Sequence, residues 1–259
     1  MTEVLTNILL PGRISAVAGP QQESSFRTVL AMHIVAAHLV ENPHMNATWI
    51  DTLGSFQPFR MRDVVIDHLR GDYDHPEQEQ DVDLYPSKPT IASVMDRISL
   101  IRAFDDEGLM DSLTDLDTPS AVSTESAKGI YVVDSVSYIF THAMREDQIT
   151  GHASMVSYLK QLRLVSMNNR LISVLLLPTV ATSEADMIRS QFPGIDIKPA
   201  LGPTFLYTID FCALLFRDSQ SGIHIFEVIA DRFDNSENQL LTFELTNHKL
   251  AFHRAVSES

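Results

Sequence analysis

The chain has 259 residues, of which 44% are hydrophobic and 20% are charged. These proportions are ordinary for one large globular domain, and they exclude a disordered, collagen-like or repeat protein. The formal net charge of −15 argues against strong autonomous binding to DNA, because duplex affinity depends largely on Lys and Arg side chains that neutralise phosphates.

Two segments carry much of the negative charge. Residues 71–89 and 105–117 together hold twelve of the 34 acidic residues and a single base, Lys88. We interpret both as solvated surface loops of one domain that covers residues 1–259. The alternative is that they form a docking or autoinhibitory surface for a basic partner.

The apolar segments point to a soluble protein of a reducing compartment. Cys212 is the one cysteine, and it lies in an apolar run, which predicts a buried thiol and excludes disulfides. The longest apolar stretch, residues 29–40, contains His33 and His38. It is also shorter than the roughly 20 residues that a membrane-spanning helix needs. The N-terminus lacks the pattern of a signal peptide, so we expect an intracellular protein without a membrane anchor.

Short apolar strands alternate with helices along the chain. We expect strands at 13–18, 48–51, 130–133 and 171–177, and helices at 24–40, 59–69, 90–104 and 152–167. Further on, we expect a hairpin of strands 204–217 and 223–230, and an edge pair of strands 241–245 and 250–253. Buried strands between helices are typical of a parallel sheet covered on both faces. We therefore predict an α/β fold, with a mostly parallel sheet flanked by helices and antiparallel strands at the C-terminal edge.

The first strand-to-helix junction is where such a sheet would bind a ligand. A phosphate-binding loop there needs two glycines, a lysine for the β/γ oxygens, and a Ser or Thr for magnesium. Gly19 supplies the first glycine, but Ser24, Ser25 and Phe26 occupy the next three required positions, and Glu23 adds a negative charge. We expect triphosphate binding in the usual mode to be lost or badly weakened.

A second motif gives the junction a family context. Residues 50–60 read Ile-Asp-Thr-Leu-Gly-Ser-Phe-Gln-Pro-Phe-Arg. This segment resembles the "IDTEGTFRPER" signature of the eukaryotic and archaeal RecA-type strand-exchange recombinases. The glutamate of that signature polarises the attacking water, and Leu53, which stands at its position, has no proton-accepting group.

Further stretches match the same family in the correct order, over roughly residues 8–232. Residues 102–104 resemble its "ARAF" segment, and residues 130–135, which include Asp134, are similar to its Walker B strand. Residues 175–180 stand where the family has "VITNQV", with Thr179 in place of the sensing glutamine. Residues 199–202 with Phe205 resemble a turn common in recombinase paralogues. The resemblance implies a RecA-like core in a recombinase paralogue, with Asp134 retained as a relic of the fold.

The resemblance also implies a role. The family's N-terminal DNA-binding domain and its Phe-x-x-Ala linker motif have no counterpart before Gly19, so we expect no self-assembled filament. We expect instead a nuclear, non-catalytic adaptor or mediator in homologous recombination, without cofactor or metal. Its expected partners are another paralogue or a Shu-type subunit and, through it, the recombinase filament. The helix at 24–41 and the disabled nucleotide face are the candidate contact surfaces.

Direct DNA contact is a weaker hypothesis. The two loops that contact DNA in the family correspond here to about residues 138–150 and 179–198. They offer Arg145, Arg189 and Lys198, each accompanied by acidic residues. A composite DNA site shared with a partner is therefore the more plausible form.

Two alternatives stay open. One is a DNA-dependent ATPase whose residual activity uses Asp134 and is completed by a partner's groups. The other is a structural RecA-like subunit of a different assembly, such as Elongator. The ten histidines form no HExxH motif, so the sequence favours no metalloenzyme. The matches at residues 51–56 and 199–202 favour recombination over Elongator.

Overall fold

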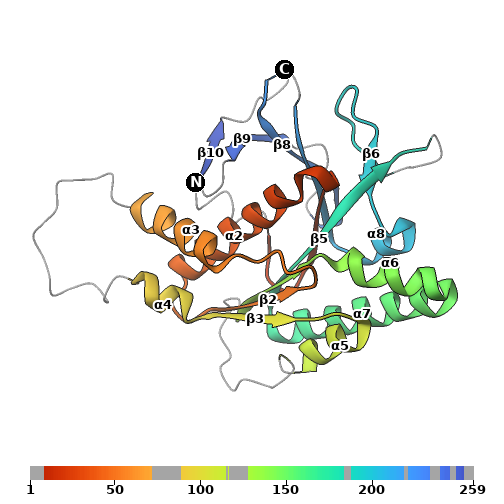
Figure 1. Cartoon of the computed structure of the whole chain (residues 1–259), viewed down its shortest axis with the longest axis horizontal. Helices are drawn as coiled ribbons and strands as arrows, with labels where there is room; N and C mark the ends of the chain where they lie inside the picture. The colour runs from red at the N-terminus through yellow and green to blue at the C-terminus, as the bar shows by residue number, and fades with distance from the viewer. Residues whose placement is uncertain are drawn as a thin grey trace, which may run out of the picture.

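The computed structural model describes residues 9–71, 89–114, 116, 128–183, 188–218, 221–233, 240–245 and 249–253. Within them, one sheet has the strand order β10-β9-β8-β7-β1-β5-β4-β2-β3, and β6 pairs with β5 beside this path. Helices lie on both faces of the sheet (Figure 1). This arrangement confirms the predicted α/β class.

The central part of the sheet is parallel. Its strands are β1 (Ile14–Gly19), β2 (Asn46–Asp51), β3 (Ile98–Arg102), β4 (Gly129–Asp134), β5 (Leu171–Ala181) and β7 (Phe211–Arg217). Every pairing among these six strands is parallel. The carboxyl ends of β1, β2 and β4 consequently meet at one edge, because parallel strands all end on the same side.

The C-terminal strands pair antiparallel, as expected from the sequence. They are β8 (His224–Asp231), β9 (Leu240–Leu245) and β10 (Leu250–His253), which follow β7 in order across the sheet. The short strand β6 (Ile197–Pro199) also pairs antiparallel, with the end of β5. Both predicted hairpins are therefore present, although the first strand of one is shorter than predicted.

Two apolar clusters sit on opposite faces of the sheet. One lies under α2 (Ser24–Glu41), α3 (Pro58–Gly71) and α4 (Ile91–Met95). The other lies under α5 (Asp106–Thr114), α6 (Val136–Glu146), α7 (Gln148–Asn169) and α8 (Gly202–Thr208). Neighbouring strand residues divide between them: Trp49 belongs to the first cluster and Ile50 to the second. Side chains alternate along a strand in this way, which explains why these strands are apolar on both faces.

The predicted helix at 90–104 is wrong beyond its first turns. Thr90 and Ser93 form a capping box that starts α4, but the helix ends at Met95 and the chain continues as β3. Ile98 packs against the first cluster and Ile101 against the second. A spacing of three places residues on one face of a helix but on opposite faces of a strand. Pairing with β2 selected the strand for residues 98–102.

Two other expectations need correction. Residues 202–208 form α8 rather than the start of a strand, and Pro203 stands in the first turn of that helix. Residues 106–114 of the second acidic segment form α5, with Leu109 and Leu113 buried, rather than a loop. Nearly all of the first acidic segment, residues 71–89, lies outside the described residues, so its assignment as a surface loop stays a prediction.

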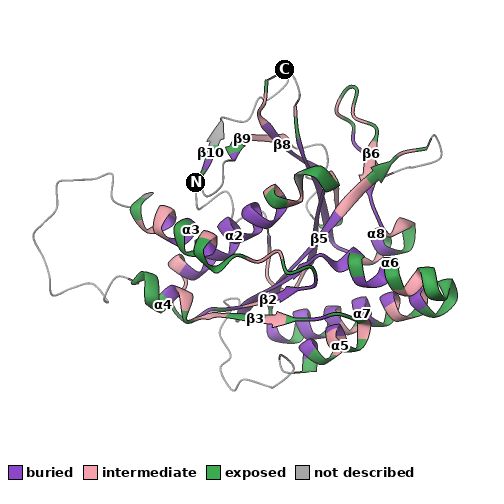
Figure 2. Cartoon of the chain, viewed as in Figure 1, coloured by how far each residue is buried: buried purple, intermediate pink, exposed green. Residues whose placement is uncertain are grey.

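Helix α2 is an internal element. Thirteen of its 18 residues are buried, and Figure 2 shows most of its length in the buried colour. The expectation that this helix is a contact surface is therefore wrong, because α3 and the sheet already cover its apolar residues. Its two histidines are also buried, and the ring of His33 lies 3.1 Å from that of His68 on α3, between Nδ1 and Nε2.

The buried histidines make stability depend on pH. Burial lowers the pKa of both His38 and His68 from 6.5 to about 4. Because the unfolded chain takes up protons below pH 6.5 and the folded chain does not, the free energy of unfolding falls as the pH falls from 6.5 towards 4. Each of the two histidines should lower the free energy of unfolding by about 1.4 kcal/mol as the pH falls from 7.5 to 5.5.

Urea unfolding at pH 7.5 and pH 5.5 would measure this cost. We expect His38→Gln to show a loss between the two pH values that is smaller than that of the native chain by about 1.4 kcal/mol. His44→Gln is the matched control, because His44 is exposed. If His38→Gln and His44→Gln lost the same free energy of unfolding between the two pH values, the lowered pKa of His38 would be contradicted.

Candidate functional site

The candidate site lies at the carboxyl edge of β1, β2 and β4. Asp51 and Asp134 are direct neighbours in the β2–β4 register, and Gly19 ends β1. Both carboxylates are buried. The structure thus gathers Gly19, Asp134 and the signature segment of residues 50–60, as their order in the sequence predicted.

Asp51 organises the turn that follows β2. Its Oδ1 atom accepts hydrogen bonds from the backbone N–H groups of Leu53 at 3.2 Å, Gly54 at 2.8 Å and Ser55 at 3.0 Å. Its Oδ2 atom accepts a fourth, from Phe56 at 3.2 Å. A buried carboxylate needs such donors to offset its lost hydration. The turn is therefore fixed by the chain itself, and it holds the side chain of Leu53 45% exposed at the edge of the sheet.

Asp134 is satisfied by hydroxyl groups. Its Oδ2 atom accepts hydrogen bonds from Thr28 Oγ1 at 2.6 Å and Ser55 Oγ at 3.1 Å. Burial raises the pKa of Asp134, while these two hydrogen bonds and the charge of Arg27 act in the opposite direction. The next residue continues the same connection, because Ser135 donates its N–H to Thr52 Oγ1 at 2.9 Å. The ends of β2 and β4 are thereby joined.

The junction between β1 and α2 is filled by an arginine. Residues 21–23 form a single turn of 3₁₀ helix, and α2 begins at Ser24. Arg27 is buried and donates from Nη1 to the carbonyl oxygens of Gly19 and Pro20, the second at 2.7 Å. Gly19 itself is closely packed, since a Cβ atom there would lie 2.4 Å from the carbonyl oxygen of Leu215.

Phe26 belongs to an aromatic cluster on the far side of this junction. Its ring centroid lies 4.4 Å from that of His224 on β8, in an edge-to-face arrangement. His224 in turn stacks against Phe243 on β9, with 5.9 Å between centroids. The residue at the position of the magnesium-binding hydroxyl therefore packs into the core between α2 and the C-terminal strands.

These residues do not fit a magnesium triphosphate. Ser25 is exposed and uncharged, and Arg27 is committed to two backbone carbonyls. Leu53 cannot accept a proton, and both hydroxyl partners of Asp134 come from the protein. Within the described residues, no group of three or more His, Cys, Asp or Glu side chains could hold a metal ion.

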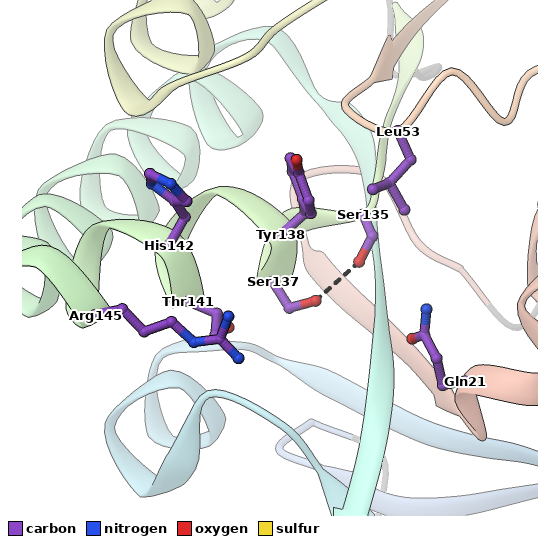
Figure 3. A pocket seen from close by; sticks show the side chains of 8 residues that line it. All are labelled: Gln21, Leu53, Ser135, Ser137, Tyr138, Thr141, His142 and Arg145. Atoms are coloured by element: carbon purple, nitrogen blue, oxygen red, sulfur yellow. Dashed lines mark hydrogen bonds between the residues drawn. The ribbon is translucent and has the colours of Figure 1, made fainter.

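A cavity of about 220 Å³ opens beside this edge. Figure 3 shows its lining residues, most of which lie on or just before α6: Gln21, Leu53, Ser135, Ser137, Tyr138, Thr141, His142 and Arg145. Ser135 Oγ and Ser137 Oγ lie 2.9 Å apart and share a hydrogen bond. Arg145 is exposed at the end of α6. The cavity offers hydroxyl groups and one guanidinium to a ligand or to a side chain of a partner.

The expected DNA loops are only partly loops. Residues 138–150 form most of α6 and the start of α7, so the first is wrong. In the second, β5 extends to Ala181 and β6 contains Lys198, opposite Val180. Arg189 lies between these strands and is half-buried. Arg145 lies at the end of α6, whereas Lys198 lies on β6 and Arg189 precedes it in the chain, so a DNA site shared by the three stays a prediction.

Sequence reasoning missed three side chains that shape the site. Thr28 and Arg27 lie on the first turns of α2, just beyond the motif positions, and Asp51 lies within the signature itself. Motif comparison considers the residues that contact nucleotide, whereas the contacts that give these three their place in the site are with other residues of the chain. The signal that the sequence offered for Arg27 is that no other Lys, Arg, Asp or Glu occurs in residues 24–40.

Comparisons with known proteins agree with the fold. No family model matches the sequence. The chain is 25% identical over 217 residues to the DNA repair protein RAD51 homolog 4 of Bos taurus, over 83% of this chain and 58% of that protein. It thus spans somewhat more than half the length of this relative. The crystal structure of the RadB recombinase is similar with a TM-score of 0.63 and 17% identity, over 93% of this chain and 91% of that chain.

Substitution of Gly19 would test whether packing alone requires a glycine there. We expect Gly19→Ala to lower the free energy of unfolding by about 3 kcal/mol, because the new methyl group meets a backbone oxygen that cannot move cheaply. Gly54→Ala is the matched control: it meets no atom within 4 Å, and only its positive φ of 72° is strained, at about 1 kcal/mol. Urea unfolding followed by the fluorescence of Trp49, the one tryptophan, would measure both. If Gly19→Ala and Gly54→Ala lowered the free energy of unfolding equally, close packing at Gly19 would not explain the need for a glycine there.

Proposed function

Because this chain is a RecA/Rad-type recombinase paralogue, we propose that it serves as a non-catalytic adaptor or mediator subunit in homologous recombination repair. One observation carries the non-catalytic part of the proposal. The buried guanidinium of Arg27 caps the carbonyls of Gly19 and Pro20, and no lysine is present at the junction. The turn that would surround a triphosphate is stabilised by the protein alone.

The same edge supports a role in binding protein. Leu53 and Phe104 each follow, by two residues, the paired positions Asp51 and Arg102, so they stand at adjacent strand ends. The side chain of Phe104 is 73% exposed, and Tyr138, at the mouth of the cavity, is also exposed. The central part of a protein–protein interface is typically formed by apolar and aromatic side chains such as these. ATP sits at subunit interfaces in the recombinase family, so this is the edge where a paralogue partner would bind.

The expected partners follow from this reading. Another recombinase paralogue or a Shu-type subunit would cover the edge that carries Leu53 and Phe104, and would connect the chain to the recombinase filament. DNA would be bound, if at all, through a composite site to which Arg145 contributes. The protein would act in the nucleus. None of the described helices is long and apolar enough to cross a membrane.

Isothermal titration with ATP and magnesium tests the non-catalytic part. We expect no heat of binding, because Ser25 and Phe26 stand where a lysine and a magnesium-binding hydroxyl would hold the triphosphate. Saturable binding, together with ATP turnover that disappears in Asp134→Asn, would instead establish the residual ATPase.

Co-purification from cells tests the adaptor part. We expect the tagged native chain to retain another recombinase paralogue, identified by mass spectrometry. The double variant Leu53→Lys, Phe104→Asp should retain at least about tenfold less, since charges replace apolar contacts at the centre of the interface. The control is Leu164→Lys, an exposed residue on α7, which should retain the native amount. Recovery of Elongator subunits, or of no partner at all, would contradict the proposal.

A further inference from the structure

A second surface lies at the opposite edge of the sheet. It is formed around Arg13, Arg163, Tyr207, Arg232 and Phe233, which come from the start of β1, from α7, from α8 and from the end of β8. Asp210 connects these segments, because its N–H donates to the carbonyl of Ile14 and its carbonyl accepts from the N–H of Arg232. The six residues of β1 separate this surface from Gly19 by about 20 Å.

Two buried carboxylates hold two of its arginines in place. Asp210 lies 2.9 Å from Nη1 of Arg163, and Nη2 of the same arginine donates to the carbonyl of Thr208. Asp231 lies 3.8 Å from Nη1 of Arg13. Both aspartates are buried, whereas both arginines are partly exposed. Each guanidinium group is therefore held by a buried carboxylate while part of its side chain remains exposed, so little side-chain entropy is lost when it binds.

Exposed aromatic rings stand beside these guanidinium groups. The guanidinium carbon of Arg13 lies 4.5 Å above the ring centroid of Phe233. Phe233 is nevertheless 62% exposed and Tyr207 is 58% exposed. Arg232, also exposed, donates to the carbonyl of Tyr207 and so links the two aromatic residues. Large rings that remain this exposed beside fixed cations are typical of a ligand-binding surface.

The local charge is opposite to that of the whole chain. Lys160 and Arg170 extend the basic character along α7, and residues 160–170 contain no acidic residue. Arg170 precedes Leu171, whose carbonyl accepts the N–H of Gly12, next to Arg13. Among the described residues of these segments, five cations accompany two carboxylates, Asp210 and Asp231, both of which are buried. A basic patch of this kind in a chain of net charge −15 indicates an anionic ligand.

We propose that this surface binds single-stranded nucleic acid. Arginines and lysines would contact successive phosphates, and the rings of Phe233 and Tyr207 would stack with unpaired bases. An acidic peptide would satisfy the cations but would leave both rings without a matching group, so the aromatic residues favour nucleic acid. The inference is independent of the adaptor role and of the cavity that contains Arg145, because it involves neither the nucleotide edge nor its partners.

Fluorescence anisotropy of a labelled oligothymidylate, titrated with the full-length chain at low salt, tests the proposal. We expect the native chain to bind, and the double variant Arg232→Glu, Phe233→Ala to bind about tenfold or more weakly, because it loses one phosphate contact and one stacking platform. Arg170→Glu should weaken binding less and should also reduce its dependence on salt. Both variants keep the buried aspartates and their hydrogen bonds to the backbone N–H groups of Arg232 and Phe233, so thermal unfolding should show that both remain folded.

The double variant Arg62→Glu, Phe59→Ala is the matched control. It changes the same residue types at exposed positions on α3 and should bind oligothymidylate like the native chain. Polyglutamate should compete only weakly. The proposal fails if the native chain does not bind, if both double variants bind equally, or if polyglutamate displaces the oligonucleotide at equal charge, which would indicate an acidic protein partner instead.

Discussion

The carboxylate of Asp51 accepts four backbone hydrogen bonds from one turn, and the arrangement of the carboxyl edge depends on it. Through Ser55 this turn also reaches Asp134, and Thr52 and Ser135 join the ends of β2 and β4. The chain itself thus supplies partners for four backbone amides, for both oxygens of Asp51 and for Oδ2 of Asp134. Since unpaired buried polar groups are costly, this closed set of bonds keeps the edge rigid in the absence of a ligand.

Arg27 extends the same arrangement to the end of β1, which β5 separates from β4 in the sheet. In a phosphate-binding loop, backbone N–H groups are unpaired until an anion binds. In the turn between β1 and α2 of this chain, the buried guanidinium of Arg27 instead donates to two backbone carbonyls. Phe26, which stands at the hydroxyl position, contributes to the core instead. Phe26 and Arg27 thus stabilise the fold at the place where a recombinase has residues that bind its ligand. The proposed loss of catalysis is thus accompanied by a structural replacement.

The two surfaces that we propose for binding lie at opposite edges of the sheet and differ in chemistry. The carboxyl edge exposes Leu53 and Phe104, which suit a protein partner. The opposite edge exposes arginines beside Phe233, which suit a polyanion with flat bases. Because the rigid central sheet separates them, a partner and a nucleic acid strand could occupy the molecule at the same time. That arrangement is what an adaptor requires.

The sequence by itself determined the α/β class, the buried strands, and the replacement of the lysine and glutamate by Ser25 and Leu53, because apolar periodicity and motif order are local properties. It could not decide between helix and strand at Ile98–Arg102, where the spacing suits both and only pairing with β2 chose the strand. It also mistook α6 for a DNA loop and α2 for an outer surface. The contacts of Arg27 with Gly19, of Thr28 with Asp134 and of Arg13 with Phe233 were decided by tertiary structure alone. Most of these pairs join residues far apart in the chain, and no local pattern records which distant segments the sheet brings together.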